Sequence, residues 1–405
     1  MNKKIKIIII SHAFVVSVNQ DRWRRLAEDG SYEVHLLIPK HWESDWFGSD
    51  SKKVYKSKEV NDGNFHAHAL ATTSVKNWGR YFFKSFDAKF RKIKPDLIYI
   101  IQDESSLIHQ QIYIYKKIFA PNAKIIFFSM NAKGVPKKRF YHRWLWGSIK
   151  KNTNAALVHY PGCLESLRNS GYIKPVYLQT QVGVNEKLFS PNKLVRDQYR
   201  KTMGFEGKFV IGYSGRLTSD KGVDDLLSIL PLDDIDWALL LVGNGDMYGE
   251  ITELIKRNGW CDRVNITGFV EQTEVPNYMN AMDCFVLGSK TMPHWLDTFP
   301  LVTVQAQACG VPVIASDSAS LPWQLADSAL FFNEGDRDEL KEKVLMLANN
   351  IELQHEYIKK GRERCLSYFC HVGITVNFKK IVHQVLGGKY EYHQEDEEYT
   401  QSKAY

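Results

Sequence analysis

The sequence lacks any long apolar run. Purely apolar stretches such as residues 7–10 and 238–242 are far shorter than the roughly 20 residues that a helix needs to span a bilayer. The first ten residues have a basic start, but polar Ser11 and His12 follow without a small-residue cleavage site. We therefore expect no membrane span, and a buried strand rather than a signal peptide at the amino terminus.

Cysteine is scarce as well. The chain has six cysteines among 405 residues and no C-x-x-C pair, and several lie in apolar runs, where a free thiol packs as a small hydrophobic group. This usage fits a reducing compartment, so we expect a cytoplasmic protein. The thirteen histidines form no H-x-x-x-H or His/Cys cluster along the sequence, which gives zinc chemistry no support.

The composition, with 44% hydrophobic and 24% charged residues, is that of a soluble globular protein. A length of 405 residues is enough for two ordinary domains. The formal net charge of +7 indicates an anionic partner. A nucleotide sugar, an acidic lipid surface and nucleic acid would all meet that requirement.

Short apolar runs alternate with helical patterns along the chain, which predicts two parallel α/β sheets. Strands are expected at residues 5–10, 33–38, 97–101, 124–128, 155–158 and 176–178, and then at 209–213, 237–242, 264–267, 284–287, 313–315 and 330–332. A polar segment between the two sets interrupts the alternation and predicts a linker. The last seventeen residues, 389–405, are polar and acidic, which predicts disorder.

The most specific motif follows the strand at residues 209–213. Gly215 and Gly222 enclose Arg216 and Lys221 in the turn after this strand. Backbone N–H groups at such a turn, together with fixed cations, bind phosphate. We expect this turn to bind a diphosphate; the alternative is a surface turn with two solvated cations.

A second motif occupies residues 297–316. Polar Asp297-Thr-Phe-Pro300 precedes a small-residue helix start, and Gly310-Val-Pro leads into another buried strand. Parallel strands present such side chains at their carboxyl ends, where they can accept hydrogen bonds from the hydroxyl groups of a sugar. In order and separation, the two motifs resemble the nucleotide-binding domain of the retaining glycosyltransferases of family 4.

This resemblance is strongest over residues 180–335 and weaker in the first half. It implies an α/β fold of the GT-B type, with two Rossmann-like parallel-sheet domains facing a central cleft. The expected boundaries are 1–185 for an acceptor-side domain, 186–207 for a linker, 208–373 for a nucleotide-sugar-binding domain, 374–388 for a helix that returns to the first domain, and 389–405 for a disordered tail.

The resemblance also implies roles for individual residues. Arg216, Lys221 and Asp297 are expected to take part in catalysis. Donor binding is expected of residues in the neighbouring loops: Gly215, Gly243, Asn244, Gly245, Phe269, Val270, Ser289, Thr298, Phe299, Pro300, Leu301, Val302 and Gln305. The family has glycine where this chain has Pro300, which removes a backbone N–H, and it has a second acidic residue where this chain has Gln305. No metal ion and no cofactor are implied.

Candidates for the acceptor side follow strands of the first half: His12, Gln102, Asp103, Glu104 and Asn131. For His12, a role in the cleft and a structural role are equally open. Two basic, aromatic stretches, residues 76–94 and 133–151, suit either an anionic membrane surface or nucleic acid. In the first stretch, aromatic residues spaced by four favour the buried face of one helix.

We therefore expect an enzyme that transfers a hexosyl or pentosyl group from a nucleotide diphosphate sugar to a hydroxyl acceptor with retention, in polysaccharide or glycolipid assembly. Peripheral contact with the inner membrane face would fit this role. The alternatives are a glycosyltransferase that modifies nucleic acid, a sugar-nucleotide epimerase, and a degenerate sugar-binding relative. Pro300 and Gln305 motivate the last of these.

Overall fold

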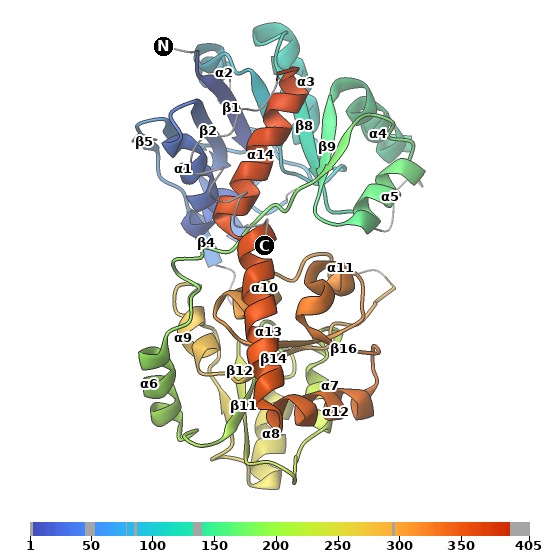
Figure 1. Ribbon diagram of the computed structural model, residues 1–405. Helices are drawn as coiled ribbons and strands as arrows, with labels where there is room; N and C mark the ends of the chain where they lie inside the picture. Colours follow the sequence, from blue (N-terminus) through green and yellow to red (C-terminus); the bar gives the residue numbers. More distant parts are fainter. Residues whose placement is uncertain are drawn as a thin grey trace. The chain divides into compact units, whose positions relative to one another are not determined.

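The computed structural model describes residues 3–44, 53–77, 79–84, 87–132, 140–293 and 296–388. The chain divides into two compact units. Among the described residues, the first unit comprises those before Val184 and those from His371 onward, and the second comprises Val184–Cys370. Each unit contains a parallel sheet with helices packed against it (Figure 1). The prediction of two α/β units is confirmed.

The sheet of the first unit has eight strands in the order β10-β9-β8-β7-β1-β2-β6-β5, and all neighbours are parallel except β5 and β6. The strands are β1 (Ile5–Ile10), β2 (Tyr32–Pro39), β5 (Val60–Asp62), β6 (Phe65–Leu70), β7 (Leu97–Ile100), β8 (Lys124–Ser129), β9 (Ala155–Val158) and β10 (Val176–Leu178). A separate antiparallel ribbon pairs β3 (His41–Ser44) with β4 (Lys53–Lys56). The strands β1, β7, β8 and β9 are almost wholly buried, which is why they appear in the sequence as continuous apolar runs.

The helices of the first unit are α1 (Asp21–Glu28), α2 (Asp87–Ile93), α3 (Ile108–Phe119), α4 (Phe140–Asn152), α5 (Pro161–Asn169) and α14 (His371–Leu386), with short 3-10 turns η1 (Ala13–Val15) and η2 (Ser17–Gln20). None of the helices among the described residues of the chain is both long enough and apolar enough to span a membrane.

Helix α14 is the last described helix, yet it packs in the first unit. In Figure 1 it is drawn in red beside the blue helix α1. The rings of Phe378 and Trp23 pack in a T-shaped arrangement with 5.2 Å between centroids, and Lys379 forms an ion pair with Asp29 at 2.5 Å. These contacts fix the returning helix, which begins at His371, three residues before the expected start at residue 374.

The sheet of the second unit has six parallel strands in the order β13-β12-β11-β14-β15-β16. They are β11 (Phe209–Ser214), β12 (Trp237–Val242), β13 (Val264–Ile266), β14 (Cys284–Leu287), β15 (Val313–Ser316) and β16 (Leu330–Phe332). The helices are α6 (Lys193–Met203), α7 (Val223–Ser228), α8 (Tyr248–Asn258), α9 (Val275–Asn280), α10 (Leu301–Ala308), α11 (Leu321–Leu325), α12 (Arg337–Ala348) and α13 (Ile351–Arg364), with shorter turns η3 (Ser219–Lys221), η4 (Ala326–Ser328) and the π-helical η5 (Cys365–Phe369).

The segment 186–207, expected as a linker, is part of the second unit instead. It contains helix α6, which begins at the capping side chain of Asn192 and ends at the left-handed residue Gly204. Arg196 and Arg200 both form ion pairs with Asp283, directly before β14. The polar composition therefore belongs to a surface helix anchored by ion pairs, and the predicted linker is wrong.

The expected helix over the aromatic residues of segment 76–94 is also wrong in most of its length. Among the described residues of this segment, helix is confined to 87–93, and a β-bridge joins Thr72 to Phe83 before them. Tyr81 and Phe83 belong to this extended segment, and their side chains are buried. Trp78 and Phe86, which completed the expected periodicity, lie outside the described residues.

Both parallel sheets reverse their strand order beside their first strand. In the first unit, β2 and β7 lie on opposite sides of β1 and are continued outward in opposite directions. In the second unit, β12 and β14 flank β11 in the same way. Ligands of such sheets bind outside the carboxyl ends of the strands at this reversal. The candidate sites are therefore the loops after β1 and β7, and those after β11 and β14.

Candidate functional site

The loops after β11 and β14 meet through an ion pair. Lys221 Nζ lies 2.5 Å from Asp297 Oδ2, and the Ser289 hydroxyl donates to the same oxygen at 2.8 Å. Only about a tenth of the Asp297 side chain is exposed. This carboxylate is therefore held in one orientation by a cation and a hydroxyl, at the place where the strand order reverses.

Arg216 extends from the same loop toward solvent. Its side chain is 46% exposed, and its closest acidic neighbour, Asp220, lies 3.7 Å away. The Tyr213 hydroxyl donates to the Arg216 carbonyl at 2.6 Å and fixes the backbone there. Burial, with Asp297 and Asp220 nearby, raises the pKa of Tyr213, so this hydroxyl stays protonated and keeps donating.

Two glycine pairs allow these loops to approach one another. A Cβ atom on Gly222 would lie 2.1 Å from the Gly288 carbonyl oxygen, and one on Gly243 would lie 1.9 Å from the Gly215 carbonyl oxygen. Gly222 also has φ +72°, a conformation that costs other residues free energy. The close packing of the loops after β11, β12 and β14 thus requires glycine at these positions.

The loop after β14 leads into helix α10 with Pro300 as the N-cap. The Pro300 carbonyl accepts from the Thr303 hydroxyl at 2.9 Å and from the Gln324 amide at 3.2 Å, and the Ser320 hydroxyl donates to the Asp297 carbonyl at 3.0 Å. The first N–H groups of α10, those of Leu301 and Val302, have no acceptor within the helix. Such a helix start attracts anions.

The other predicted donor residues lie in loops of the same unit. A bridge between Gly243 and Gly268 joins the loops after β12 and β13, and the Asn244 carbonyl accepts from the Leu217 N–H at 3.0 Å. Phe269 is 42% exposed, whereas Val270, Thr298 and Phe299 are half-buried and Gln305 is buried on α10.

In the first unit, His12 and Gln102 follow β1 and β7 and touch. His12 Nδ1 lies 3.0 Å from Gln102 Oε1, and Gln102 donates to the Tyr81 hydroxyl at 2.8 Å. The imidazole also stands 5.0 Å from the Trp42 ring, between centroids. Desolvation lowers the pKa of His12 to about 4. His12 is therefore neutral near pH 7 and can accept or donate one proton in a hydrogen bond.

Glu104 is buried behind the same edge of the sheet and accepts a hydrogen bond from the Ser129 hydroxyl at the end of β8. Burial, followed by the charge of Asp103, raises the pKa of Glu104 to about 7. Asp103 itself accepts from the Ser105 N–H and hydroxyl, and the Asn131 N–H approaches the Ser129 oxygen at 3.4 Å. The five acceptor-side candidates thus lie at the carboxyl ends of β1, β7 and β8.

We predict that the Glu104 carboxyl makes the stability of the protein depend on pH. Its pKa is near 4.5 in an unfolded chain and about 7 in the folded protein, so the unfolded state ionises first as pH rises. The protonated Glu104 contributes fully to stability below pH 4.5. As pH rises to 7 this contribution is lost, and the free energy of unfolding falls by up to about 3 kcal/mol. Glu104→Gln cannot ionise. Denaturant unfolding should show the variant gaining stability relative to wild type between pH 5 and pH 8, and a constant difference would contradict the assignment.

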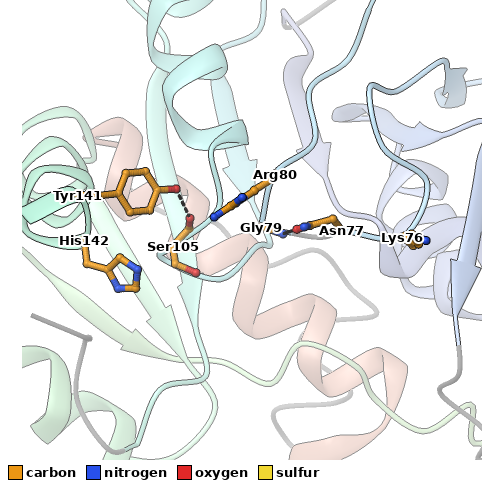
Figure 2. A pocket seen from close by; sticks show the side chains of 7 residues that line it. All are labelled: Lys76, Asn77, Gly79, Arg80, Ser105, Tyr141 and His142. Carbon is orange, nitrogen blue, oxygen red and sulfur yellow. Dashed lines mark hydrogen bonds between the residues drawn. The ribbon is translucent and has the colours of Figure 1, made fainter. Parts of the chain in front are cut away.

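A pocket of about 460 Å³ opens in the first unit beside these residues. Its lining is Lys76, Asn77, Gly79, Arg80, Ser105, Tyr141 and His142. Figure 2 shows the Tyr141 hydroxyl directed at the Ser105 carbonyl, 3.3 Å away, with Arg80 reaching toward them from the other side. Two cations, a histidine and no carboxylate among its lining residues make this pocket suited to an anion.

The two cations of this pocket lie in the basic stretch 76–94, which the sequence predicted to suit an anionic partner, whereas a second grouping was not predicted. His35, His66 and His68 stack against one another in the first unit, although their spacing in the sequence indicated no cluster. The spacing His66-Ala-His68 was the available signal, because alternate residues of a strand share a face. Lys137, Lys138 and Arg139, the basic run of the second aromatic stretch, lie outside the described residues.

Comparison with known proteins finds a family model that matches most of the second unit. The family model described as "Glycosyl transferases group 1" matches residues 195–364. The chain is 24% identical over 349 residues to an uncharacterized 41.2 kDa protein in the cps region of Klebsiella pneumoniae, covering 84% of this chain and 88% of that protein. It is 30% identical over 184 residues to a GDP-mannose-dependent monoacylated alpha-(1-6)-phosphatidylinositol monomannoside mannosyltransferase of Corynebacterium glutamicum, covering 44% and 48% respectively.

Among solved structures, HepE from Anabaena in complex with UDP superposes with a TM-score of 0.69 at 16% identity and covers 94% of this chain and all of that chain. At this identity the likeness concerns the fold. That fold is GT-B, as the family resemblance of the sequence implied.

Proposed function

We propose that this chain, a glycosyltransferase by the group 1 domain over residues 195–364, transfers a glycosyl group from a nucleoside diphosphate sugar to a hydroxyl acceptor, with retention at the anomeric carbon. The product is a glycan or a glycolipid. The observation that carries the proposal is the pairing of Lys221 with Asp297 beside the exposed Arg216, at the reversal of a parallel sheet.

In this proposal the diphosphate of the donor lies against Arg216 and Lys221 and near the start of α10. Breaking the bond between the anomeric carbon and the phosphate oxygen places more negative charge on the leaving group. Fixed cations lower the energy of that transition state, because they meet the charge without having to reorient. The charge is supplied by side chains, so the proposed reaction needs no metal ion.

Asp297 is proposed to orient the sugar. Its Oδ2 is occupied by Lys221 and Ser289, so the other carboxylate oxygen is the one that would accept from sugar hydroxyls. An acid already bound to a cation and a hydroxyl is a weak nucleophile. We therefore propose that the acceptor attacks from the face of the departing diphosphate and gives its proton to that phosphate, which retains the configuration.

Two relatives support a nucleotide sugar as the donor. HepE was solved with UDP, and the Corynebacterium enzyme is named for its use of GDP-mannose. These two differ in the base, and the loop residues that would border a base, Phe269 and Val270, offer no base-specific side-chain donor or acceptor. The donor is therefore best identified by a panel.

The test is a thermal-shift panel of UDP-, GDP-, ADP- and dTDP-sugars with purified protein, followed by assay of the stabilising donors for release of free nucleoside diphosphate. Binding raises the melting temperature by mass action. Release of nucleoside diphosphate, independent of added Mg²⁺, is the expected result. An epimerase would convert the sugar without releasing nucleotide, and a sugar-binding relative would bind without turnover; either outcome would contradict the proposal.

We further propose that the acceptor carries an anionic group, such as a phosphate, bound in the pocket around Arg80. The Asn77 side chain accepts from the Gly79 N–H at 3.1 Å, and the Leu107 N–H donates to the Gly79 carbonyl at 3.0 Å. This turn is therefore tied to the segment that follows β7, close to the predicted acceptor residues.

Arg80→Ala should weaken binding of a short alkyl phosphate about tenfold, the usual loss for one charge-assisted hydrogen bond, while binding of the matching alkyl alcohol is unaffected. Isothermal titration would measure both. Arg216→Ala is the control, because it removes a cation from the donor loops instead. Loss of binding in Arg216→Ala, with binding retained in Arg80→Ala, would place the phosphate in the donor loops and contradict the pocket assignment.

Contact with an anionic membrane is proposed through the start of helix α4. Phe140 is 84% exposed and Trp144, one turn later, is 51% exposed, whereas Leu145 and Ile149 are buried. The helix therefore presents aromatic side chains to solvent on the face away from its core contacts, and Arg143 lies between them in sequence. Aromatic and basic side chains together favour an anionic interface.

Replacing Phe140 and Trp144 with serine should lower the fraction of protein that sediments with anionic vesicles at least about tenfold, since each aromatic side chain contributes more than 1 kcal/mol when buried. The matched control is Ile173→Ser, a 91% exposed apolar residue elsewhere in the same unit. Sedimentation with single-stranded and duplex DNA as competitors tests the nucleic-acid alternative. Vesicle binding that survives the double replacement would contradict the proposal.

A further inference from the structure

One carboxylate and three imidazoles share a face of the first sheet, away from the sites described above. In the parallel pair β2 and β6, His35 is the register partner of His66, and Leu37 is the partner of His68. Because side chains alternate along a strand, Glu33 and His35 lie on the same face as His66 and His68. The rings stack with centroids 4.6 Å apart for His35 and His66 and 5.4 Å apart for His35 and His68.

The donor atoms of three of these residues converge. One carboxylate oxygen of Glu33 and one ring nitrogen each of His35 and His66 all lie within 4.8 Å of one another. His35 Nε2 and Glu33 Oε1 are 2.9 Å apart. With metal–ligand bonds of about 2.0–2.1 Å, ligand atoms of a tetrahedral zinc site are about 3.3–3.4 Å apart. Small side-chain rotations would therefore convert this group into a coordination site.

Neighbouring side chains hold the second ring nitrogen of both imidazoles, and the Nε2 proton that His35 now directs at Glu33 leaves when a metal ion binds. His66 Nδ1 contacts the side-chain amide oxygen Oδ1 of Asn61, which can only accept, so the proton sits on Nδ1 and the lone pair on Nε2. His35 Nδ1 lies 3.1 Å from His68 Nε2. Histidines that bind metals are held in this way through their second nitrogen, and here the holding groups come from β5 and β6.

The competing explanation is a hydrogen-bonded chain that includes an ordinary ion pair. Lys6 Nζ approaches Glu33 at 3.1 Å, but the lysine side chain is 34% exposed and can turn into solvent. Such a partly exposed pair contributes little to stability. The stacking of three histidines across two strands is not accounted for by that ion pair.

We propose that Glu33, His35 and His66 bind one divalent transition-metal ion of the zinc class, with solvent completing the coordination and with His68 as a positioning residue for His35. The ligands lie in the first half of β2 and on β6, one strand from the sheet edge. They are therefore separate from the loops at the carboxyl ends of β1 and β7. The ion would fasten the β5–β6 edge to β2, a structural role independent of the proposed sugar transfer.

The test uses full-length protein without a histidine tag and with the exposed Cys261 replaced by serine. Co²⁺ is the probe, because a tetrahedral site gives visible absorption bands. One Co²⁺ per chain, displaced by Zn²⁺, is expected. His66→Ala should weaken binding roughly 100-fold or more, and His68→Ala about tenfold, the usual loss when a supporting group is removed.

His355→Ala is the control, because His355 is exposed on α13 in the other unit, and its Co²⁺ spectrum should equal that of the parent. Glu33→Gln provides a second ligand variant of unchanged size, should His66→Ala fail to fold. Zn²⁺ should raise the melting temperature of the parent protein and of His355→Ala, but of neither ligand variant. Absence of tetrahedral bands in the parent, or their persistence in the ligand variants, would overturn the proposal.

Discussion

Replacing Arg216 with alanine is expected to lower the rate of transfer from the nucleotide sugar by about 100-fold or more, which is the usual loss when one group that stabilises developing charge is removed. The fold should be unaffected, because the side chain is 46% exposed and its contact with Asp220 is 3.7 Å long. Steady-state kinetics with the donor found by the panel gives the rate, and thermal unfolding reports the fold.

Lys221→Ala should cause a similar loss of rate but also a lower melting temperature. The buried Asp297 carboxylate would lose its cation, and an unpaired buried charge is destabilising. Lys201→Ala, an exposed lysine on α6 of the same unit, is the matched control and should change neither quantity. Wild-type turnover in both Arg216→Ala and Lys221→Ala would show that the diphosphate is not bound by this loop.

Gly222→Ala is expected to reduce the transfer rate at least as strongly, by displacing the two loops that carry these groups. The added Cβ would lie 2.1 Å from the Gly288 carbonyl oxygen and 2.5 Å from the Gly288 Cα, so the backbones after β11 and β14 must separate by roughly 1 Å. A misplacement of about 1 Å costs on the order of 100-fold in rate. The positive φ adds about 1–2 kcal/mol of strain.

The structure supplies a control for the strain alone. Gly259, at the end of α8, has φ +66° and nothing within 4 Å of its added Cβ. Gly259→Ala should therefore be less stable than wild type because of backbone strain, but should keep wild-type activity. Denaturant unfolding measures the stability, and steady-state kinetics measures the activity. If the two variants retained equal activity, close packing of the two loops would not matter for transfer.

The buried strands of both sheets were predicted from the sequence nearly to the residue. Strands β1, β9, β10, β12, β14 and β16 have the expected bounds. Each of these strands is an apolar run that ends at turn-forming or polar residues, so the local pattern alone is informative. Strands β3, β4, β5 and β6 were missed. In β6, the alternation Phe65-His-Ala-His-Ala-Leu70 is short and its polar members are histidines.

Helix α6 was missed for a related reason. It buries none of its residues completely and is attached through Arg196 and Arg200 to an aspartate more than eighty positions away. Local pattern does not reveal a helix whose anchoring partners are distant charges. Local pattern was also misleading for Tyr81 and Phe83. Their side chains are buried, but they lie in an extended segment whose aromatic spacing predicted a helix.

By itself, the sequence determined the two parallel α/β sheets, the glycine turn with Arg216 and Lys221, and the polar loop at Asp297, because each depends on residues close together along the chain. Tertiary structure decided which loops meet. Only the placement of β14 beside β11 brings Lys221 to Asp297, and only the pairing of β2 with β6 stacks His35 on His66. Both contacts follow from strand order, which is fixed by packing of the whole sheet and is not encoded in any single segment.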